Sequence, residues 1–276
     1  MEDREILWML LFFLGLFLPF DDASSQLHSE IPTSNEVIHG GSTKFVVAKY
    51  FEIHRNFEDS SYQRYLATLT ACERPSHLPS VSVLRRQLRG EGYHRDLFST
   101  FKIVGWSQLC KAILIEKLPY SIFADSFELK RLLQYDEFKD VAVMGDTNLE
   151  LPAFLSNRSL VEIHLNVDRR PIAVEKEIDI RLPLHARYPP LVENGYFDTK
   201  FESPDLLMLC GDGQEEEILC GLELQDVQTH EQPLWKIPSG RTAHSSFVSC
   251  ATFIAAFVST FAIVVVSLQH YRNRNC

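Results

Sequence analysis

The densest group of reactive side chains in this sequence is the string Gly92-Tyr93-His94-Arg95-Asp96-Leu97. His, Arg and Asp side chains that meet at one point could transfer a proton. Consecutive residues of a β-strand point to opposite faces, so His94, Arg95 and Asp96 on a strand would not converge on one substrate atom. We therefore expect these three residues to be structural or to face a partner.

Two groups of carboxylates also suggest chemistry. Glu175 and Glu177 would share one face of a strand, as an acid/base pair needs, but a solvated strand face explains the same spacing. Residues 215–217 form a run of Glu that follows Asp212 and could bind a cation. This run lacks the alternating oxygen ligands of a calcium loop. We interpret both groups as solvated surface.

The sequence contains none of the common catalytic or metal-binding motifs. Its ten His residues are dispersed, with no His-Glu-x-x-His and no close His/Cys cluster, so nothing in the sequence supports a zinc site. Gly-x-Ser-x-Gly, Asp-x-Asp and the phosphate-binding glycine loops are missing as well. We predict no catalytic residue, no cofactor and no metal ligand.

The formal net charge of −10 limits the classes of partner. Nucleic-acid binding requires Lys and Arg gathered against phosphate groups. Basic residues are scattered here apart from Arg85, Arg86 and Arg89, a short cluster that we interpret as a solvated face. We expect no nucleic-acid partner.

Residues 6–20 form an apolar run near the start of the chain. The run is short for a bilayer span, which needs ~20 residues, and small residues follow at 23–25. This layout predicts a secretory signal peptide at residues 1–25. The acidic residues Glu2 and Asp3 are unusual in such a leader, so an uncleaved anchor stays open as an alternative.

A second apolar segment, residues 247–268, contains no charged residue and is long enough to cross a bilayer as a helix. Arg272 and Arg274 follow it, and basic residues beside a span prefer the cytosolic side. We predict a transmembrane helix at 247–268, a cytosolic tail at 269–276 and a large lumenal or extracellular segment before the span.

A lumenal segment lies in an oxidising compartment, where disulfides persist. Its cysteines are Cys72, Cys110, Cys210 and Cys220, and the sequence leaves their three connectivities open. Cys210 and Cys220 bracket an acidic loop and could close a hairpin. Asn157 begins the sole Asn-x-Ser/Thr string in the chain, which predicts a glycosylated lumenal surface loop.

Strand patterns dominate the segment between the two apolar runs. Apolar and polar residues alternate in 161–167 and 178–184, which predicts one face on a core and the other in water. Pro183 suits an edge strand or a bulge. One short helix is expected at 126–133. The predicted strands are residues 45–53, 97–104, 112–115, 161–167 and 178–184.

Many short strands with few helices predict a mainly β fold. We expect a lumenal antiparallel β-sandwich-like domain followed by a single C-terminal transmembrane helix. The domain is expected at residues 90–246, preceded at 26–89 by a variable lumenal region with strands.

Six strings, in this order, resemble one family, the class X protein of glycosylphosphatidylinositol biosynthesis. The resemblance covers residues 90 to about 268. The strings are Gly92 to Leu97; Cys110 through Leu118-Pro119 to Asp125 and Glu128-Leu129; Leu149-Glu150 with Pro152 and Leu155-Ser156; Leu182-Pro183-x-His185-x-Arg187-Tyr188; Pro204-Asp205-Leu206-Leu207-Met208 with Cys210 and then Cys220; and Pro238-x-Gly240-x-Thr242-x-His244.

The resemblance implies a non-catalytic subunit of the endoplasmic reticulum membrane. Such subunits bind and stabilise the multi-spanning class M subunit, which transfers the first mannose from dolichol-phosphate-mannose to the glucosaminyl-phosphatidylinositol intermediate. It also implies that the residues of the matching strings are structural or partner-facing. These residues are His94, Arg95, Asp96, Pro119, Asp125, His185, Arg187, Tyr188, Pro204, Asp205, Pro238, Gly240 and His244.

Two other functions stay open when the residues are taken without the resemblance. The first is a cell-surface receptor or adhesion-type β-sandwich ectodomain, which surface labelling of intact cells would detect. The second is a lumenal enzyme acting on glycans, which would require the lumenal domain to turn over a substrate.

Overall fold

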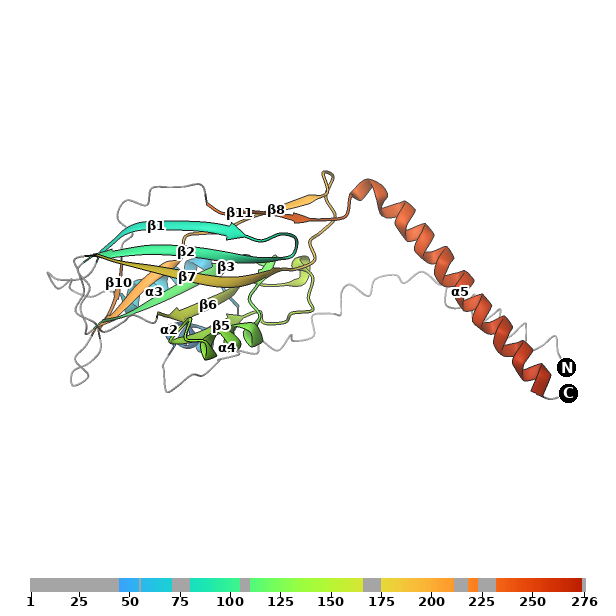
Figure 1. Cartoon of the computed structure of the whole chain (residues 1–276), viewed down its shortest axis with the longest axis horizontal. Helices are drawn as coiled ribbons and strands as arrows, with labels where there is room; N and C mark the ends of the chain where they lie inside the picture. The colour runs from blue at the N-terminus through green and yellow to red at the C-terminus, as the bar shows by residue number, and fades with distance from the viewer. Residues whose placement is uncertain are drawn as a thin grey trace. The chain divides into compact units, whose positions relative to one another are not determined.

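The computed structural model describes residues 45–54, 56–70, 80–104, 110–165, 175–210, 218–222 and 232–274. Their strands pair antiparallel in two larger sheets and one ribbon (Figure 1). The four-stranded sheet has the order β1 (Ser80–Arg89), β2 (His94–Val104), β7 (Glu175–Ala186), β4 (Ile122–Phe123). The five-stranded sheet has the order β10 (Ile218–Gly221), β9 (Asp205–Cys210), β3 (Cys110–Leu118), β6 (Ser159–His164), β5 (Asp140–Gly145). The ribbon pairs β11 (Leu234–Pro238) with β8 (Tyr196–Lys200).

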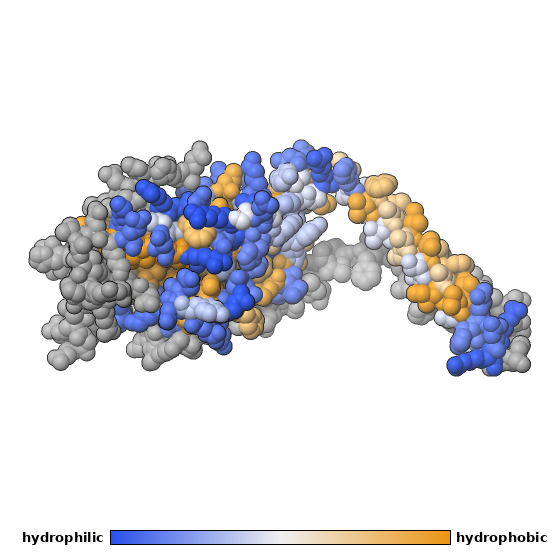
Figure 2. All heavy atoms as spheres, viewed as in Figure 1, coloured by the Kyte–Doolittle hydropathy of each residue, from blue (hydrophilic) through white to orange (hydrophobic). Residues whose placement is uncertain are grey.

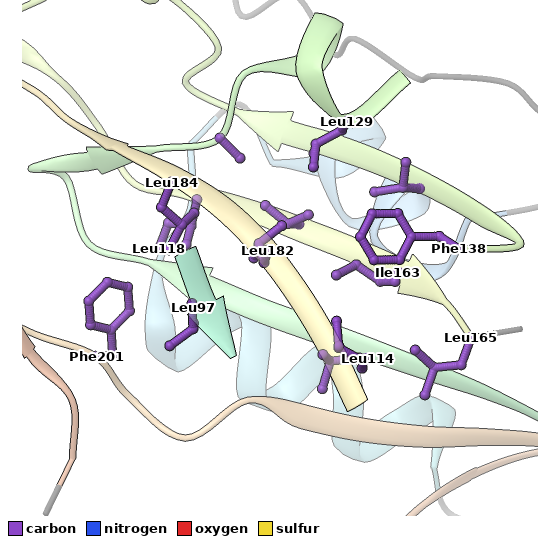
Figure 3. Close-up of a cluster of buried hydrophobic side chains, with 14 of the residues drawn as sticks. Leu97, Leu114, Leu118, Leu129, Phe138, Ile163, Leu165, Leu182, Leu184 and Phe201 are labelled. Atoms are coloured by element: carbon purple, nitrogen blue, oxygen red, sulfur yellow. The ribbon is translucent and has the colours of Figure 1, made fainter. Parts of the chain in front are cut away.

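The two larger sheets share one apolar core, as in a β-sandwich. Figure 3 shows Leu97 and Leu182 from the four-stranded sheet close to Leu114 and Ile163 from the five-stranded sheet. All four side chains are almost fully buried. The prediction of a mainly β, antiparallel sandwich-like fold is confirmed.

Two helices cover the outer face of the five-stranded sheet. They are α2 (Val46–Ile53) and α3 (Asp59–Leu69), and their buried residues pack on this face of β3, β5, β6 and β9. The alternation in β6 was therefore interpreted wrongly, because both faces of this strand are covered. Glu162 and His164, expected in water, are 0% and 4% exposed.

The strand predicted at residues 45–53 is wrong, because this segment is helix α2. Its buried residues Val47, Tyr50 and Phe51 recur at spacings of three and four, which places them on one helix face. The carboxylate of Glu162, on β6, accepts hydrogen bonds from the N–H groups of Val46 and Val47 at 2.9 and 2.8 Å. This distant carboxylate satisfies the start of the helix and outweighs the β propensity of the segment.

Most of the other local predictions hold. Strands predicted at 97–104, 112–115, 161–167 and 178–184 lie in or largely in β2, β3, β6 and β7, and the predicted helix is α4 (Ser126–Gln134). Pro183 pairs with Asp96 of β2, while β4 pairs with β7 at Ala186 and His185 alone. β7 is an inner strand, between β2 and β4, so the predicted edge strand is wrong, although Pro183 lies beyond the two residues of β7 that pair with β4. The sheet also extends before residue 90, since β1 pairs with β2.

The C-terminal helix α5 (Ser245–Arg274) includes the predicted span and is long and apolar enough to cross a membrane. It follows the short helix η3 (Thr242–His244), and none of its residues is buried. Figure 2 shows apolar residues along most of α5 and polar residues at its C-terminal end. Arg272 and Arg274 lie in that last turn.

Candidate functional site: the motif end of the sandwich

Several of the six strings meet where the β1–β2 turn and the end of β7 come together. His94 and His185 lie opposite each other in the β2–β7 ladder, and their Nδ1 atoms are 3.4 Å apart. The N–H of Ala186 donates to the carbonyl of Tyr93 at 2.8 Å. We call this region the motif end and define it as residues 90–96, 119–128, 146–158, 185–188 and 238–241.

Arg187 anchors a long loop of the motif end. Its guanidinium is buried and donates to the carbonyl oxygens of Asn148, Leu151 and Asp146. Burial lowers the pKa of Arg187, and the Asp146 carboxylate, 3.9 Å away, opposes this effect. The guanidinium also lies 5.0 Å from the ring centre of Phe123. One arginine thus holds residues 146–151 against the end of β7.

The same loop is fixed at both ends. Gly145 has a φ of 98°, and a Cβ at this position would lie 2.7 Å from the carbonyl oxygen of Arg158, so the chain requires glycine there. The Asp146 carboxylate accepts the N–H groups of Asn148 at 3.1 Å and of Asn157 at 2.7 Å. The loop therefore has a defined shape, and Asn157 lies exposed on it.

Apolar side chains are exposed where this loop meets the residue after Arg187. The short helix η2 (Ala153–Leu155) is joined to Tyr188 because the N–H of Ala153 donates to the Tyr188 carbonyl at 2.9 Å. Phe154, Leu155 and Tyr188 are 65%, 50% and 63% exposed. We call these three residues the apolar patch. Neighbouring exposed apolar side chains are typical of protein-binding surfaces.

The string His94-Arg95-Asp96 divides between the two faces of β2, as predicted. Asp96 pairs with Arg181 at 3.1 Å, whereas the guanidinium of Arg95 lies 5.4 Å from the ring centre of the buried Trp235. The side chain of His94 approaches His185, whose Nε2 lies 3.0 Å from Glu128 Oε2. Asp125 caps α4 by accepting the N–H of Phe127 at 2.9 Å, which helps to place Glu128.

The last string joins the motif end to α5. The Tyr93 hydroxyl donates to the carbonyl of Pro238. The N–H of Val192 donates to the Gly240 carbonyl at 3.1 Å, and the N–H of Thr242 donates to the Val192 carbonyl at 3.2 Å. The chain is thus hydrogen-bonded to the β domain up to Thr242. His244, the last residue of η3, is exposed.

The string that begins with Pro204 and Asp205 lies elsewhere, and these two residues lie beside α3. Pro204 is buried, and Asp205 of β9 lies 3.2 Å from Lys117 Nζ. Glu116, next to Lys117, binds Arg86 Nη2 through both oxygens, at 2.5 and 2.6 Å. We call Arg86, Glu116, Lys117 and Asp205 the buried ionic network. The solvated-face interpretation is wrong for Arg86, whose side chain is 7% exposed, and it holds for Arg85 and Arg89.

The cysteines form bonds that the sequence left open. Cys110 and Cys210 lie opposite each other in the β3–β9 ladder and form a disulfide. The predicted alternative, in which Cys210 and Cys220 close a hairpin, is therefore wrong. Cys220 is also disulfide-bonded.

Some of the sequence predictions concern residues outside the described ranges. These residues are the signal segment at 1–25, Cys72, and the acidic run at 215–217 with Asp212. Glu177 is exposed, as a solvated strand face requires.

The fold and the motif end define a class of protein. It is an antiparallel β-sandwich that displays a shaped surface and continues into one apolar C-terminal helix. The family model described as PIG-X / PBN1 matches residues 90–268, more than half of the 276 residues. The chain belongs to this family.

Three mammalian relatives carry the name "GPI alpha-1,4-mannosyltransferase I, stabilizing subunit". The Homo sapiens protein is 26% identical over 215 residues, covering 69% of this chain and 81% of the relative. The Mus musculus protein is 26% identical over 215 residues, with 69% and 83% covered. The Rattus norvegicus protein is 29% identical over 212 residues, with 68% and 82% covered. No solved structure matches.

Proposed function

We propose that this protein is the non-catalytic stabilising subunit of the mannosyltransferase that adds the first mannose to the glycosylphosphatidylinositol anchor precursor. The observation that carries the proposal is the family match over residues 90–268, which spans β2 to β11 and most of α5. The names of the three relatives, each a stabilising subunit of a GPI mannosyltransferase, support it.

In this proposal the protein lies in the endoplasmic reticulum membrane, with the β domain in the lumen and α5 as its single span. Arg272 and Arg274 in the last turn of α5 favour a cytosolic C-terminus. The Cys110–Cys210 disulfide suits an oxidising lumen, and Asn157 is exposed as a glycan acceptor must be. A gel-mobility shift removed by endoglycosidase, and missing in Asn157→Gln, would confirm this orientation. An unglycosylated wild-type protein would count against it.

The catalytic class M subunit is the proposed partner, and the apolar patch is its proposed binding surface. The motif end is hydrogen-bonded to the segment that leads into α5, so it belongs to the part of the domain nearest the bilayer. Loops of a multi-spanning enzyme emerge at the same level. A subunit that binds the folded enzyme and does not bind the unfolded enzyme would stabilise the folded enzyme by mass action.

The span would pack against the partner's helices through small residues. Ala255, Ala256 and Ser259 permit close approach of a second helix. Thr260 donates its hydroxyl hydrogen to the Ala256 carbonyl at 2.8 Å, so this donor is satisfied within α5. Replacing Ala255, Ala256 and Ser259 together with Leu should lower the abundance of the class M subunit. Unchanged abundance would reject packing at this face.

The test of the function is deletion of the gene followed by rescue. Cells without the protein should accumulate the unmannosylated glucosaminyl intermediate and lose the class M subunit, and the wild-type chain should restore both. Normal mannosylation with an unchanged class M subunit would reject the proposed function and favour a cell-surface receptor.

The test of the surface uses matched variants in the same rescue assay. Phe154→Asp combined with Tyr188→Asp places two charges in the apolar patch, so we expect loss of co-purification with the class M subunit at normal levels of this chain. Tyr135→Asp is the control, because Tyr135 is 75% exposed at the end of α4 and lies outside the patch. Equal co-purification of the patch and control variants would place the partner elsewhere.

A further inference from the structure

We propose that His94 and His185 bind a divalent metal ion of the zinc type, and that Glu128 orients His185 for this role. The inference does not depend on the proposed function. It rests on three side chains whose potential ligand atoms all lie within 4.8 Å of one another.

The separation of the two histidines is that of neighbouring ligands on one ion. A Zn–N bond is about 2.0–2.1 Å long, so two nitrogens at a tetrahedral angle lie about 3.3–3.4 Å apart. The Nδ1 atoms of His94 and His185 are 3.4 Å apart. Protein N–H···O hydrogen bonds have their mode near about 2.9–3.0 Å, so 3.4 Å is long for a direct bond between the two rings. The distance therefore suits a shared ion better than a direct bond.

The β-sheet supplies the rigidity that a metal site needs. His94 and His185 lie directly opposite each other in the β2–β7 ladder. Directly opposed residues share one face of a sheet with their Cβ atoms close together. The ring of Phe123 from β4 stacks on the His185 ring, with centres 5.2 Å apart and an angle of 16° between the planes. The orientation of His185 is thus set before an ion arrives.

Glu128 determines which ring nitrogen of His185 carries the hydrogen. A carboxylate can only accept from the ring, so its contact with Nε2 at 3.0 Å places the hydrogen of a neutral imidazole on Nε2. The Nδ1 atom, which faces His94, then carries the lone pair. A carboxylate behind a histidine in this way is the usual outer partner of a metal-binding imidazole.

The neighbouring cations have partners of their own. Arg131 lies 3.8 Å from the other oxygen of Glu128, Arg181 pairs with Asp96, and Arg187 donates to loop carbonyls. Arg131 thus shares Glu128 with His185, whereas Arg181 and Arg187 contact groups outside the cluster. His94 is exposed, which gives an ion access from solvent. Two imidazoles leave two tetrahedral positions for water or a ligand from another molecule.

Short sequence motifs do not reveal this site, because its residues are far apart in the chain. Short zinc motifs place their ligands a few residues apart. Here His94 and His185 are 91 residues apart in the chain, and Glu128 and His185 are 57 apart. The expectation that no metal ligand exists came from spacing along the chain, whereas the pairing of β2 with β7 brings these groups together.

The test uses the full chain in detergent, stripped of metal by a chelator and titrated with Co²⁺ as a coloured substitute for Zn²⁺. We expect saturable binding of one equivalent with the visible absorption of a tetrahedral site, reversed by Zn²⁺. His94→Ala and His185→Ala should abolish this absorption. Glu128→Gln should weaken binding by about 10–100-fold without abolishing it, as expected for an outer partner.

His244→Ala is the matched control, because His244 is exposed and lies outside the cluster, and it should bind like the wild-type chain. Near-ultraviolet circular dichroism checks that each variant is folded. If His185→Ala does not fold, the surface variant His94→Ala decides. No saturable Co²⁺ binding by the folded wild-type chain, or unchanged affinity in the folded histidine variants, would overturn the proposal.

Discussion

The buried ionic network and the motif end use the same side-chain types for different purposes. In the network, Glu116 is 1% exposed and Arg86 holds both of its oxygens. At the motif end, Glu128 is 17% exposed and faces His185 and Arg131. A charge without access to water depends on its partner inside the fold, whereas a partly exposed charge can exchange partners. We infer that the network maintains the fold and that the motif end is available for binding.

The ionisation of the network follows from its burial. Desolvation raises the pKa of Glu116, and Arg86 opposes this effect. Desolvation likewise raises the pKa of Asp205, and Lys117 opposes it. A carboxyl group whose pKa is raised by folding adds most stability below its unfolded pKa. That contribution is lost as the pH rises through the folded pKa.

The largest expected effect is that of Arg86→Met. This change leaves Glu116 buried without its partner, which should lower the free energy of unfolding by about 3–5 kcal/mol near pH 7. The loss of Arg86 also raises the pKa of Glu116 further, so the destabilisation should shrink as the pH falls and Glu116 takes up a proton. Urea titrations of the full chain in detergent at several pH values would measure both effects.

The control for this variant is Arg86→Met combined with Glu116→Met. Replacing both members of a buried pair by apolar residues is often close to neutral, so the double variant should recover most of the lost stability. Failure to recover would mean that the hydrogen bond from Arg86 to the Glu202 carbonyl matters more than the ion pair.

Arg187 is an exception to this contrast, because it is buried although it lies within the motif end. The variant Arg187→Met tests its role. It removes the donors for three carbonyls of residues 146–151, so we expect a loss of about 2–3 kcal/mol. Proteolysis should then cut the loop at residues 146–158 faster, as mass spectrometry of the fragments would show. Arg131→Met is the control, because Arg131 is 66% exposed. Equal cleavage of the two variants would show that Arg187 does not maintain the conformation of the loop.

Glu162→Gln should have a moderate effect on stability. The amide keeps one oxygen for the N–H groups of Val46 and Val47, where the carboxylate uses two. We expect a loss of about 1–2 kcal/mol, comparable to the loss of a helix cap. Hydrogen exchange should increase in α2 more than in α4. Uniform exchange in both helices would show that α2 does not depend on this carboxylate.

Glu128→Gln makes the same chemical change at the motif end and should have the smallest effect. A partly exposed carboxylate contributes little to stability, so the free energy of unfolding should fall by less than about 1 kcal/mol. Urea titration beside Glu162→Gln would measure the difference. A larger loss in Glu128→Gln than in Glu162→Gln would reverse the roles that we give to the two regions.

Local sequence patterns predicted much of the fold. Strands β2, β3, β6 and β7 were visible from strand propensity and alternation, and α5 from its length and composition. These features depend on neighbours in the chain. Helix α2 was missed because the group that stabilises its start, Glu162, lies on a strand more than a hundred residues later.

The sequence identified the strings that form the site, but it did not predict that they lie side by side. The strings that contain His94, Glu128, His185 and Arg187 were found in the sequence, and their meeting required the pairing order of β2, β7 and β4. Arg86 was placed in solvent because its neighbours Arg85 and Arg89 are basic. The strand alternates, however, and turns Arg86 alone of the three toward Glu116.

The hydrogen bonds of Val192 with Gly240 and Thr242 have a consequence for how a partner would be held. They leave only a few residues between the β domain and the start of α5 at Ser245. Two binding modules joined by a short connection act at a high effective concentration toward each other's targets. In the proposed complex, engagement of α5 by a helix bundle would let weak contacts at the apolar patch suffice for long-lived binding.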